Sequence, residues 1–189
     1  MKIGVYVGSF NPVHKGHIKL SRHLIKNKIV DKVLMLPTSN YWHKQNLLDI
    51  KYRVEMLNLF ETENIIIDNI HNKHPYTCQI LESLKEDYKD DELYLVIGGD
   101  NLEKLHLWKN IDEIMKNKIV VVRRANKDID INKYQNRFDI NKFIIVNDFD
   151  DYEEISSTEI RKNINSPYLD KKVFEYIKKN KLYLNENSW

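Results

Sequence analysis

Two histidines stand three residues apart, directly after the first apolar run of the chain. They belong to the segment GSFNPVHKGH at residues 8–17, which leads into an amphipathic stretch. Pro12 keeps Asn11 out of helical conformation, so we expect an extended turn before a helix that begins near His17. A helix N-terminus offers free N–H donors and a positive dipole end, and both favour phosphate. With His14 and His17 as further donors, this turn is a candidate phosphate site.

Glycine is scarce, because the 189 residues hold only 5 glycines where average usage of roughly 7% would give about 13. A sequence so sparing in glycine keeps it mainly where a side chain cannot be tolerated. We expect Gly8 to let the backbone approach a ligand and Gly16 to let His17 lie near the helix N-terminus. Gly98 and Gly99 precede Asp100, whose carboxylate could accept hydrogen bonds from ribose hydroxyls or help to place a metal ion.

The histidines have two competing interpretations. A pair of incidental surface histidines is common, but the glycine-rich, strand-to-helix context weighs against it here. Zinc binding is weaker, since no third cluster of ligands is visible, and we expect no metal site built from protein side chains. The GxGxxG fingerprint and the P-loop GxxxxGK[ST] are both absent from the sequence, which disfavours an ordinary NAD-binding domain and a standard kinase or NTPase.

Other polar and aromatic residues follow further apolar runs. The segment TSNYWHK at 38–44 could bind a ring and a phosphate, and Arg124 closes the fifth run. Trp108 could equally be a core residue. In ISSTEIR at 155–161, a capping box of Ser156 and Glu159 explains one hydroxyl at a helix start. It does not require Ser157, Thr158 or Arg161.

Apolar runs alternate with amphipathic stretches along the whole chain. Nearly continuous apolar runs are typical of parallel strands covered on both faces, and their alternation with helices indicates an α/β fold. The expected strands are 3–7, 32–36, 65–67, 93–97, 119–122 and 143–146. The expected helices are 17–29, 50–60, 76–88, 111–115, 157–164 and 171–179, with an irregular excursion at 125–141. We therefore predict one domain, 1–189, with a Rossmann-like open parallel sheet, helices on both faces and a C-terminal helical segment.

This architecture brings the candidate groups together. Parallel strands end at one edge of the sheet, and ligands of open α/β sheets bind outside those carboxyl ends. Four of the expected strands end in polar, glycine-rich or cationic loops. We expect a single cleft that is rich in phosphate-binding groups and poor in acids.

The overall composition excludes several classes of protein. A net charge of +2, from 30 basic and 28 acidic residues, is unlike the basic stripe of a nucleic-acid binder. The single cysteine, Cys78, rules out an internal disulfide and a four-cysteine zinc site. No signal peptide or apolar run of membrane-spanning length is visible. We expect a soluble, cytoplasmic protein without nucleic-acid or membrane partners, and self-association into a homo-oligomer stays open.

Two motifs resemble the HxGH and SSTxIR signatures of the nucleotidyltransferase superfamily, namely VGSFNPVHKGH at 7–17 and ISSTEIRK at 155–162. Within it, the chain is most similar to the bacterial nicotinate-nucleotide adenylyltransferases. The further matching segments, in the same order, are PTSNYWHK at 37–44, HPYT at 74–77, IGGDNLEKLHLWKNIDEI at 97–114 and VVVRR at 120–124. The resemblance covers nearly the whole chain.

The resemblance implies transfer of an adenylyl group from ATP to nicotinate mononucleotide, giving deamido-NAD and pyrophosphate, with Mg²⁺ accompanying ATP. It implies catalytic roles for His14, His17 and Arg161. The implied ATP-binding residues are Gly8, Ser9, Phe10, His14, His17, Gly98, Asp100, Ser157, Thr158 and Arg161. The implied mononucleotide-binding residues are Ser9, Lys44, Tyr76, Thr77, Asp100, Trp108 and Arg124.

Three departures from the family pattern concern the acceptor and phosphate loops. The usual PPHK is YWHK at 41–44, SYT is PYT at 75–77, and the Pro-Gly after the strand-end arginine is Ala-Asn at 125–126. The preference for nicotinate over nicotinamide mononucleotide therefore stays open. So do a sibling transferase that uses phosphopantetheine, a cytidylyltransferase, and a non-catalytic nucleotide sensor.

Overall fold

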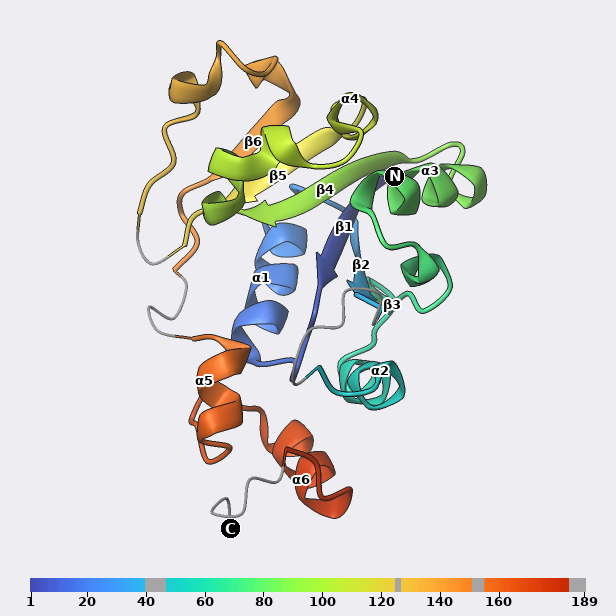
Figure 1. Cartoon of the computed structure of the whole chain (residues 1–189), viewed down its shortest axis with the longest axis vertical. Helices are drawn as coiled ribbons and strands as arrows, with labels where there is room; N and C mark the ends of the chain where they lie inside the picture. Colours follow the sequence, from blue (N-terminus) through green and yellow to red (C-terminus); the bar gives the residue numbers. More distant parts are fainter. Residues whose placement is uncertain (40–46, 125–126, 151–154, 184–189) are drawn as a thin grey trace.

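The computed structural model describes residues 1–39, 47–124, 127–150 and 155–183. In this part of the chain, six parallel strands form one sheet in the order β3-β2-β1-β4-β5-β6 (Figure 1). The strands are β1 (Lys2–Gly8), β2 (Lys32–Pro37), β3 (Ile65–Ile67), β4 (Glu92–Gly98), β5 (Lys118–Val122) and β6 (Phe143–Val146). All six strands predicted from the sequence are confirmed.

Alternating side chains of the strands divide the core between the two faces of the sheet. Val33 and Met35 of β2 belong to one buried cluster, whereas Leu34 and Leu36 belong to the other. A strand that buries both faces needs apolar residues at consecutive positions, which explains the continuous runs in the sequence.

Helices cover both faces of the sheet, as predicted (Figure 1). The helices are α1 (Lys15–Lys26), α2 (Ile50–Asn58), α3 (Thr77–Asp87), α4 (Ile111–Ile114), α5 (Ser157–Lys162) and α6 (Lys171–Lys179). Residues of α1, α2, α5 and α6 contribute to the first cluster, and residues of α3 and α4 contribute to the second. Within the described ranges, no helix combines the length and the apolarity that spanning a bilayer requires.

Several element boundaries differ from the sequence prediction by one to three residues, and helices α1 and α5 do so for clear local reasons. Helix α1 begins at Lys15 instead of His17, because His14 occupies the N-cap, and it stops before Lys28, whose φ of 56° is left-handed. Helix α5 ends at Lys162 instead of Ile164 because Asn163 is extended. The expected excursion holds only short 3₁₀ turns in its described part, 127–141, including Ile131–Tyr134.

Strands β1 and β4 are neighbours although α1, β2, α2, β3 and α3 separate them in sequence. The chain leaves this pair in opposite directions across the sheet, so their carboxyl ends form the topological switch point, where open α/β sheets bind ligands. Gly8 ends β1 and Gly98 ends β4 at this point. The glycine-bearing motifs therefore lie at the site that the topology favours.

The packing of α6 predicts that the C-terminal helix belongs to the same cooperative unit as the sheet. Ile177 is fully buried in the first cluster, together with Leu24 of α1. We expect Ile177→Ala to lower the free energy of unfolding by about 2–5 kcal/mol while urea unfolding stays a single transition.

Ile70, 64% exposed, supplies the control. Ile70→Ala should change stability by less than about 0.5 kcal/mol. A separate early transition for the C-terminal segment in Ile177→Ala would contradict a single core.

Candidate active site

The turn between β1 and α1 is shaped by side chains that press against its glycines. A Cβ atom on Gly8 would lie 2.9 Å from Cζ of Phe10, which is buried and has a left-handed φ of 44°. A Cβ on Gly16 would lie 3.1 Å from the ring of His14. A Cβ on Gly98 would collide with the carboxylate of Asp100. These glycines therefore make room for neighbouring side chains, a steric reason that the sequence interpretation, close approach to a ligand, did not include.

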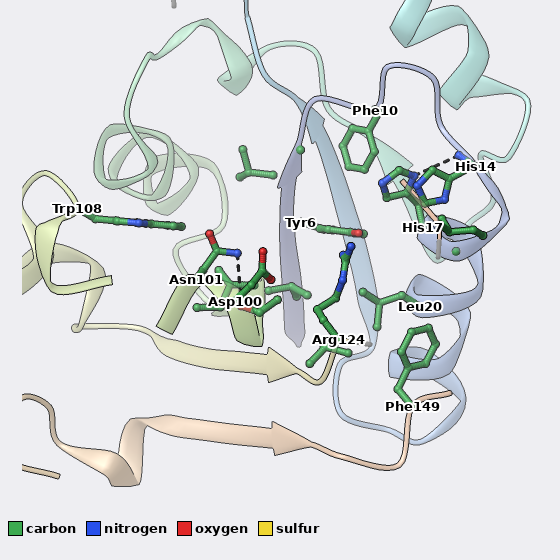
Figure 2. A pocket seen from close by; sticks show the side chains of 18 residues that line it. Tyr6, Phe10, His14, His17, Leu20, Asp100, Asn101, Trp108, Arg124 and Phe149 are labelled. Carbon is green, nitrogen blue, oxygen red and sulfur yellow. Dashed lines mark hydrogen bonds between the residues drawn. The ribbon is translucent and has the colours of Figure 1, made fainter. Parts of the chain in front are cut away.

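His14 and His17 lie face to face at the start of α1 (Figure 2). Their ring centroids are 3.6 Å apart with an interplanar angle of 24°. The backbone N–H of His14 donates to Nδ1 of His17 at 3.1 Å. Since Nδ1 accepts, a neutral His17 carries its hydrogen on Nε2, which is then a donor. The turn thus fixes both the position and the tautomer of this imidazole.

Both imidazoles are held in the neutral form. Burial lowers the pKa of His14 to about 3 and lowers the pKa of His17 well below its ordinary value. The positive charge of Arg124 lowers both further, and Figure 2 shows Arg124 reaching toward the pair. Nδ1 of His14 is buried without a hydrogen-bond partner among the described residues. An incoming anionic oxygen or a water would relieve the cost of that unsatisfied group.

Helix α5 holds the turn through its backbone carbonyls. Oγ of Ser157 donates to the carbonyl of Pro12 at 2.9 Å, and Nη1 of Arg161 donates to the carbonyl of Asn11 at 2.7 Å. Nη2 of Arg161 lies 3.3 Å from Oγ1 of Thr158. Ser156 caps the helix by accepting from the N–H of Glu159, as predicted. The SSTEIR segment therefore positions the histidine turn, and its contact with phosphate stays a prediction.

Two residues that sequence reasoning missed hold the same turn. The guanidinium of Arg53, fully buried, donates to the carbonyl of Ser9 at 2.9 Å and to the carbonyl of Leu48 at 2.8 Å. The hydroxyl of Tyr183 donates to Oδ1 of Asn11 at 2.7 Å. Burial raises the pKa of the Tyr183 phenol, which keeps it a donor. No sequence motif marks either residue. An arginine in an amphipathic helix such as α2 is expected at the surface, so nothing in the sequence indicates that Arg53 is buried.

Two cavities open at the carboxyl ends of β1 and β4. The histidine cavity, about 240 Å³, is lined by His14, His17 and Arg124 among others; the Tyr76 cavity, about 480 Å³, is lined by Tyr76 and Thr77 among others. Both are bounded by Val7, Gly8, Val96, Ile97 and Trp108. The switch point of the sheet therefore carries two adjoining compartments with different chemistry.

Most residues predicted for the site line these cavities. The histidine cavity also includes Gly8, Phe10, Gly98, Asp100 and Trp108, and the Tyr76 cavity includes Gly8, Ser9 and Trp108. Figure 2 shows Trp108 on the far side of Asp100 from the histidine pair. Ser157, Thr158 and Arg161 line neither cavity, and Lys44 lies outside the described residues.

The buried neutral histidines predict a specific dependence of stability on pH. An unfolded histidine binds a proton below about pH 6.5 whereas His14 and His17 in the folded protein do not, so stability falls as the pH is lowered from about 6.5. Each histidine should add a slope of about 1.4 kcal/mol per pH unit below that point. We expect His17→Asn to show a shallower slope than the unsubstituted protein in urea unfolding between pH 5 and 8. Equal slopes would contradict the neutral, buried assignment.

Nearly the whole chain is similar to known proteins of one family. The family described as cytidylyltransferase-like matches residues 5–163. A protein of Flavobacterium psychrophilum named "probable nicotinate-nucleotide adenylyltransferase" is 36% identical over 97% of this chain and 99% of its own length. A protein of the same name from Fusobacterium nucleatum is 35% identical over 95% and 98%.

A solved structure confirms the fold. Nicotinic acid mononucleotide adenylyltransferase of Plasmodium falciparum, complexed with NaAD, superposes with a TM-score of 0.81 at 20% identity, covering 96% of this chain and 97% of that one. Together with the full-length likeness to the bacterial relatives, this shows that the chain belongs to the nicotinate-nucleotide adenylyltransferase family of the cytidylyltransferase-like proteins.

Proposed function

We propose that this protein transfers the adenylyl group of ATP to the phosphate of nicotinate mononucleotide, giving deamido-NAD and pyrophosphate. The observation that carries the proposal is the pair of adjoining cavities at the β1–β4 switch point, which share Gly8 and Trp108. One cavity offers N–H donors and a guanidinium, and the other offers aromatic rings and hydroxyls. The names of the full-length relatives, nicotinate-nucleotide adenylyltransferases, support this choice of substrates.

In this proposal the ATP phosphates occupy the histidine cavity. The Nε2–H of His17, the charge of Arg124 and the N-terminal amides of α1 all favour anionic oxygens there. Ser157 and Arg161 support this side by holding the carbonyls of the turn. Arg161, the third predicted catalytic residue, uses Nη1 for Asn11 and Nη2 for Thr158 and has further N–H donors that could serve a phosphate.

The mononucleotide occupies the Tyr76 cavity. Its pyridine ring would lie against Trp108, with Tyr76 and Thr77 near the ring substituent. Asp100 lines the adjoining histidine cavity, so it would meet a ribose only where the two cavities join. Ser9 lies where the cavity meets the turn, which suits a phosphate group directed toward ATP. Lys44 is the further proposed ligand of that phosphate. The two substrates then meet beside Gly8, which lines both cavities.

The chemistry needs positioning more than proton transfer. A phosphate oxygen of the mononucleotide attacks the α-phosphorus of ATP, and the bond to the bridging oxygen breaks with its electron pair leaving on pyrophosphate. The attacking oxygen is already anionic, so no general base is required. In-line placement and hydrogen bonds to the charge developing on pyrophosphate supply the catalysis. Neutral histidines that donate N–H groups suit this task.

Mg²⁺ fits this site as a companion of ATP. Asp100 places one carboxylate in the histidine cavity, and no group of three or more His, Cys, Asp or Glu in the described ranges could hold a metal ion by itself. Mg²⁺ commonly binds through one or two carboxylates together with substrate phosphates and water. Its contribution would be to neutralise phosphate charge, with Asp100 as the protein ligand.

Replacement of His17 tests the proposed mechanism. We expect His17→Ala to lower kcat for pyrophosphate release about 100-fold to 1000-fold, the usual loss for one donor to developing charge. Circular dichroism should show an intact fold. His106→Ala, at an exposed position outside both cavities, should keep normal turnover. Near-normal activity of a folded His17→Ala protein would remove His17 from the mechanism.

The same assay distinguishes the candidate functions. Pyrophosphate release with ATP and nicotinate mononucleotide, and not with nicotinamide mononucleotide or phosphopantetheine, supports the proposal. Release with another acceptor alone would identify a sibling transferase. ATP binding without turnover of any acceptor would identify a nucleotide sensor.

A further inference from the structure

The Tyr76 cavity has an uneven distribution of charge. Lys109 is the only charged residue among the described residues that line it; the others are apolar, aromatic or hydroxyl-bearing, with glycine and proline. No motif singled out Lys109 in the sequence, where it follows Trp108. Among the described residues, this ammonium group is therefore the only charged side chain that a ligand in the compartment would meet.

The backbone around Lys109 is anchored on both sides. The 3₁₀ segment Gly99–Leu107 ends just before it, with the N–H of Trp108 donating to the carbonyl of Leu105 at 3.0 Å. Asn110, left-handed with a φ of 50°, then caps α4. The backbone position of Lys109 is thus fixed beside Trp108, the residue proposed to contact the pyridine ring.

The side chain of Lys109 is directed onto Tyr76. Its Nζ lies 3.9 Å from the centroid of the Tyr76 ring, within the range of an attractive cation–π contact. Tyr76 is also the N-cap of α3, and the first turn of α3 contains no acidic residue. The ammonium and the positive end of the α3 dipole therefore face the same part of the cavity, and both favour an anion.

We propose that Lys109 is a specificity-determining residue that makes this site prefer the acid over the amide of a pyridine mononucleotide, an inference that rests on the proposed function. Nicotinate mononucleotide carries a carboxylate on its cationic ring, whereas nicotinamide mononucleotide carries a neutral carboxamide on the same ring. An ammonium attracts the first substituent and repels the uncompensated ring charge of the second. Such discrimination combines an attractive and a repulsive contact.

Among the described residues, the other polar side chains of the cavity carry no charge, so Lys109 and the α3 dipole are what favour the acid electrostatically. Hydroxyls of Ser9, Thr38 and Thr77 both donate and accept, so they can serve a carboxylate or a carboxamide. Lys109 is exposed, so salt screens its contribution and limits its size. We therefore expect a moderate, salt-dependent preference.

The test compares Lys109→Gln with Lys109→Arg and with Lys104→Gln, which removes an exposed charge outside both cavities. The readout is the ratio of kcat/KM for nicotinate mononucleotide to kcat/KM for nicotinamide mononucleotide, measured by pyrophosphate release. We expect Lys109→Gln to lower this ratio about tenfold, equivalent to about 1.4 kcal/mol, with KM for ATP unchanged. Lys109→Arg and Lys104→Gln should keep the ratio close to that of the unsubstituted protein. High ionic strength should lower the ratio of the two kcat/KM values in the unsubstituted protein, and it should leave this ratio nearly constant in Lys109→Gln.

The outcomes separate this inference from the proposed function. If the unsubstituted protein discriminates and Lys109→Gln discriminates equally, or loses both activities in proportion, the role of Lys109 is overturned while the proposed function stands. If the unsubstituted protein neither binds nor turns over either mononucleotide, the proposed function fails and the inference fails with it.

Discussion

The backbone carbonyls of the turn after β1 accept hydrogen bonds from groups far away in the chain, and the geometry of the site depends on these contacts. The carbonyls of Ser9, Asn11 and Pro12 accept from Arg53, Arg161 and Ser157 respectively. A buried carbonyl without a donor costs about 1–3 kcal/mol. The positions of the turn and of the histidines that follow it therefore depend on the docking of helices α2 and α5.

Because of this dependence, the C-terminal helices help to shape the candidate site. Helices α5 and α6 lie beyond the carboxyl end of β1 (Figure 1), and both pack into the cluster that includes α1. With the turn held from outside, His14 and His17 can be buried, stacked and neutral in the cavity that we propose receives the triphosphate. In that proposal the histidines supply N–H donors, and the fixed positive charge comes from Arg124 instead of from the imidazoles.

The fold was predictable because continuous apolar runs and amphipathic stretches report burial directly. The candidate site was predictable where a residue type stood out in its context, as His14 and His17 do after an expected strand end, whereas Trp108 was assigned only through the family resemblance. Arg53 and Lys109 were not predictable, because their roles depend on tertiary neighbours. Arg53 contacts a carbonyl that is distant in sequence, and Lys109 contacts the ring of Tyr76. The predicted close approach of ligand to the glycines stays a prediction, and the structure shows instead that Gly8 and Gly16 make room for side chains of their own turn.

We propose that two adjoining compartments at the β1–β4 switch point hold the two substrates on either side of Gly8. A crystal structure with a non-hydrolysable ATP analogue and nicotinate mononucleotide tests it most directly. We expect the triphosphate beside His14 and His17, the pyridine ring against Trp108 in the Tyr76 cavity, and the α-phosphorus in line with the mononucleotide phosphate. A pyridine ring bound on the histidine side, or both ligands in one cavity, would contradict this assignment of the two compartments.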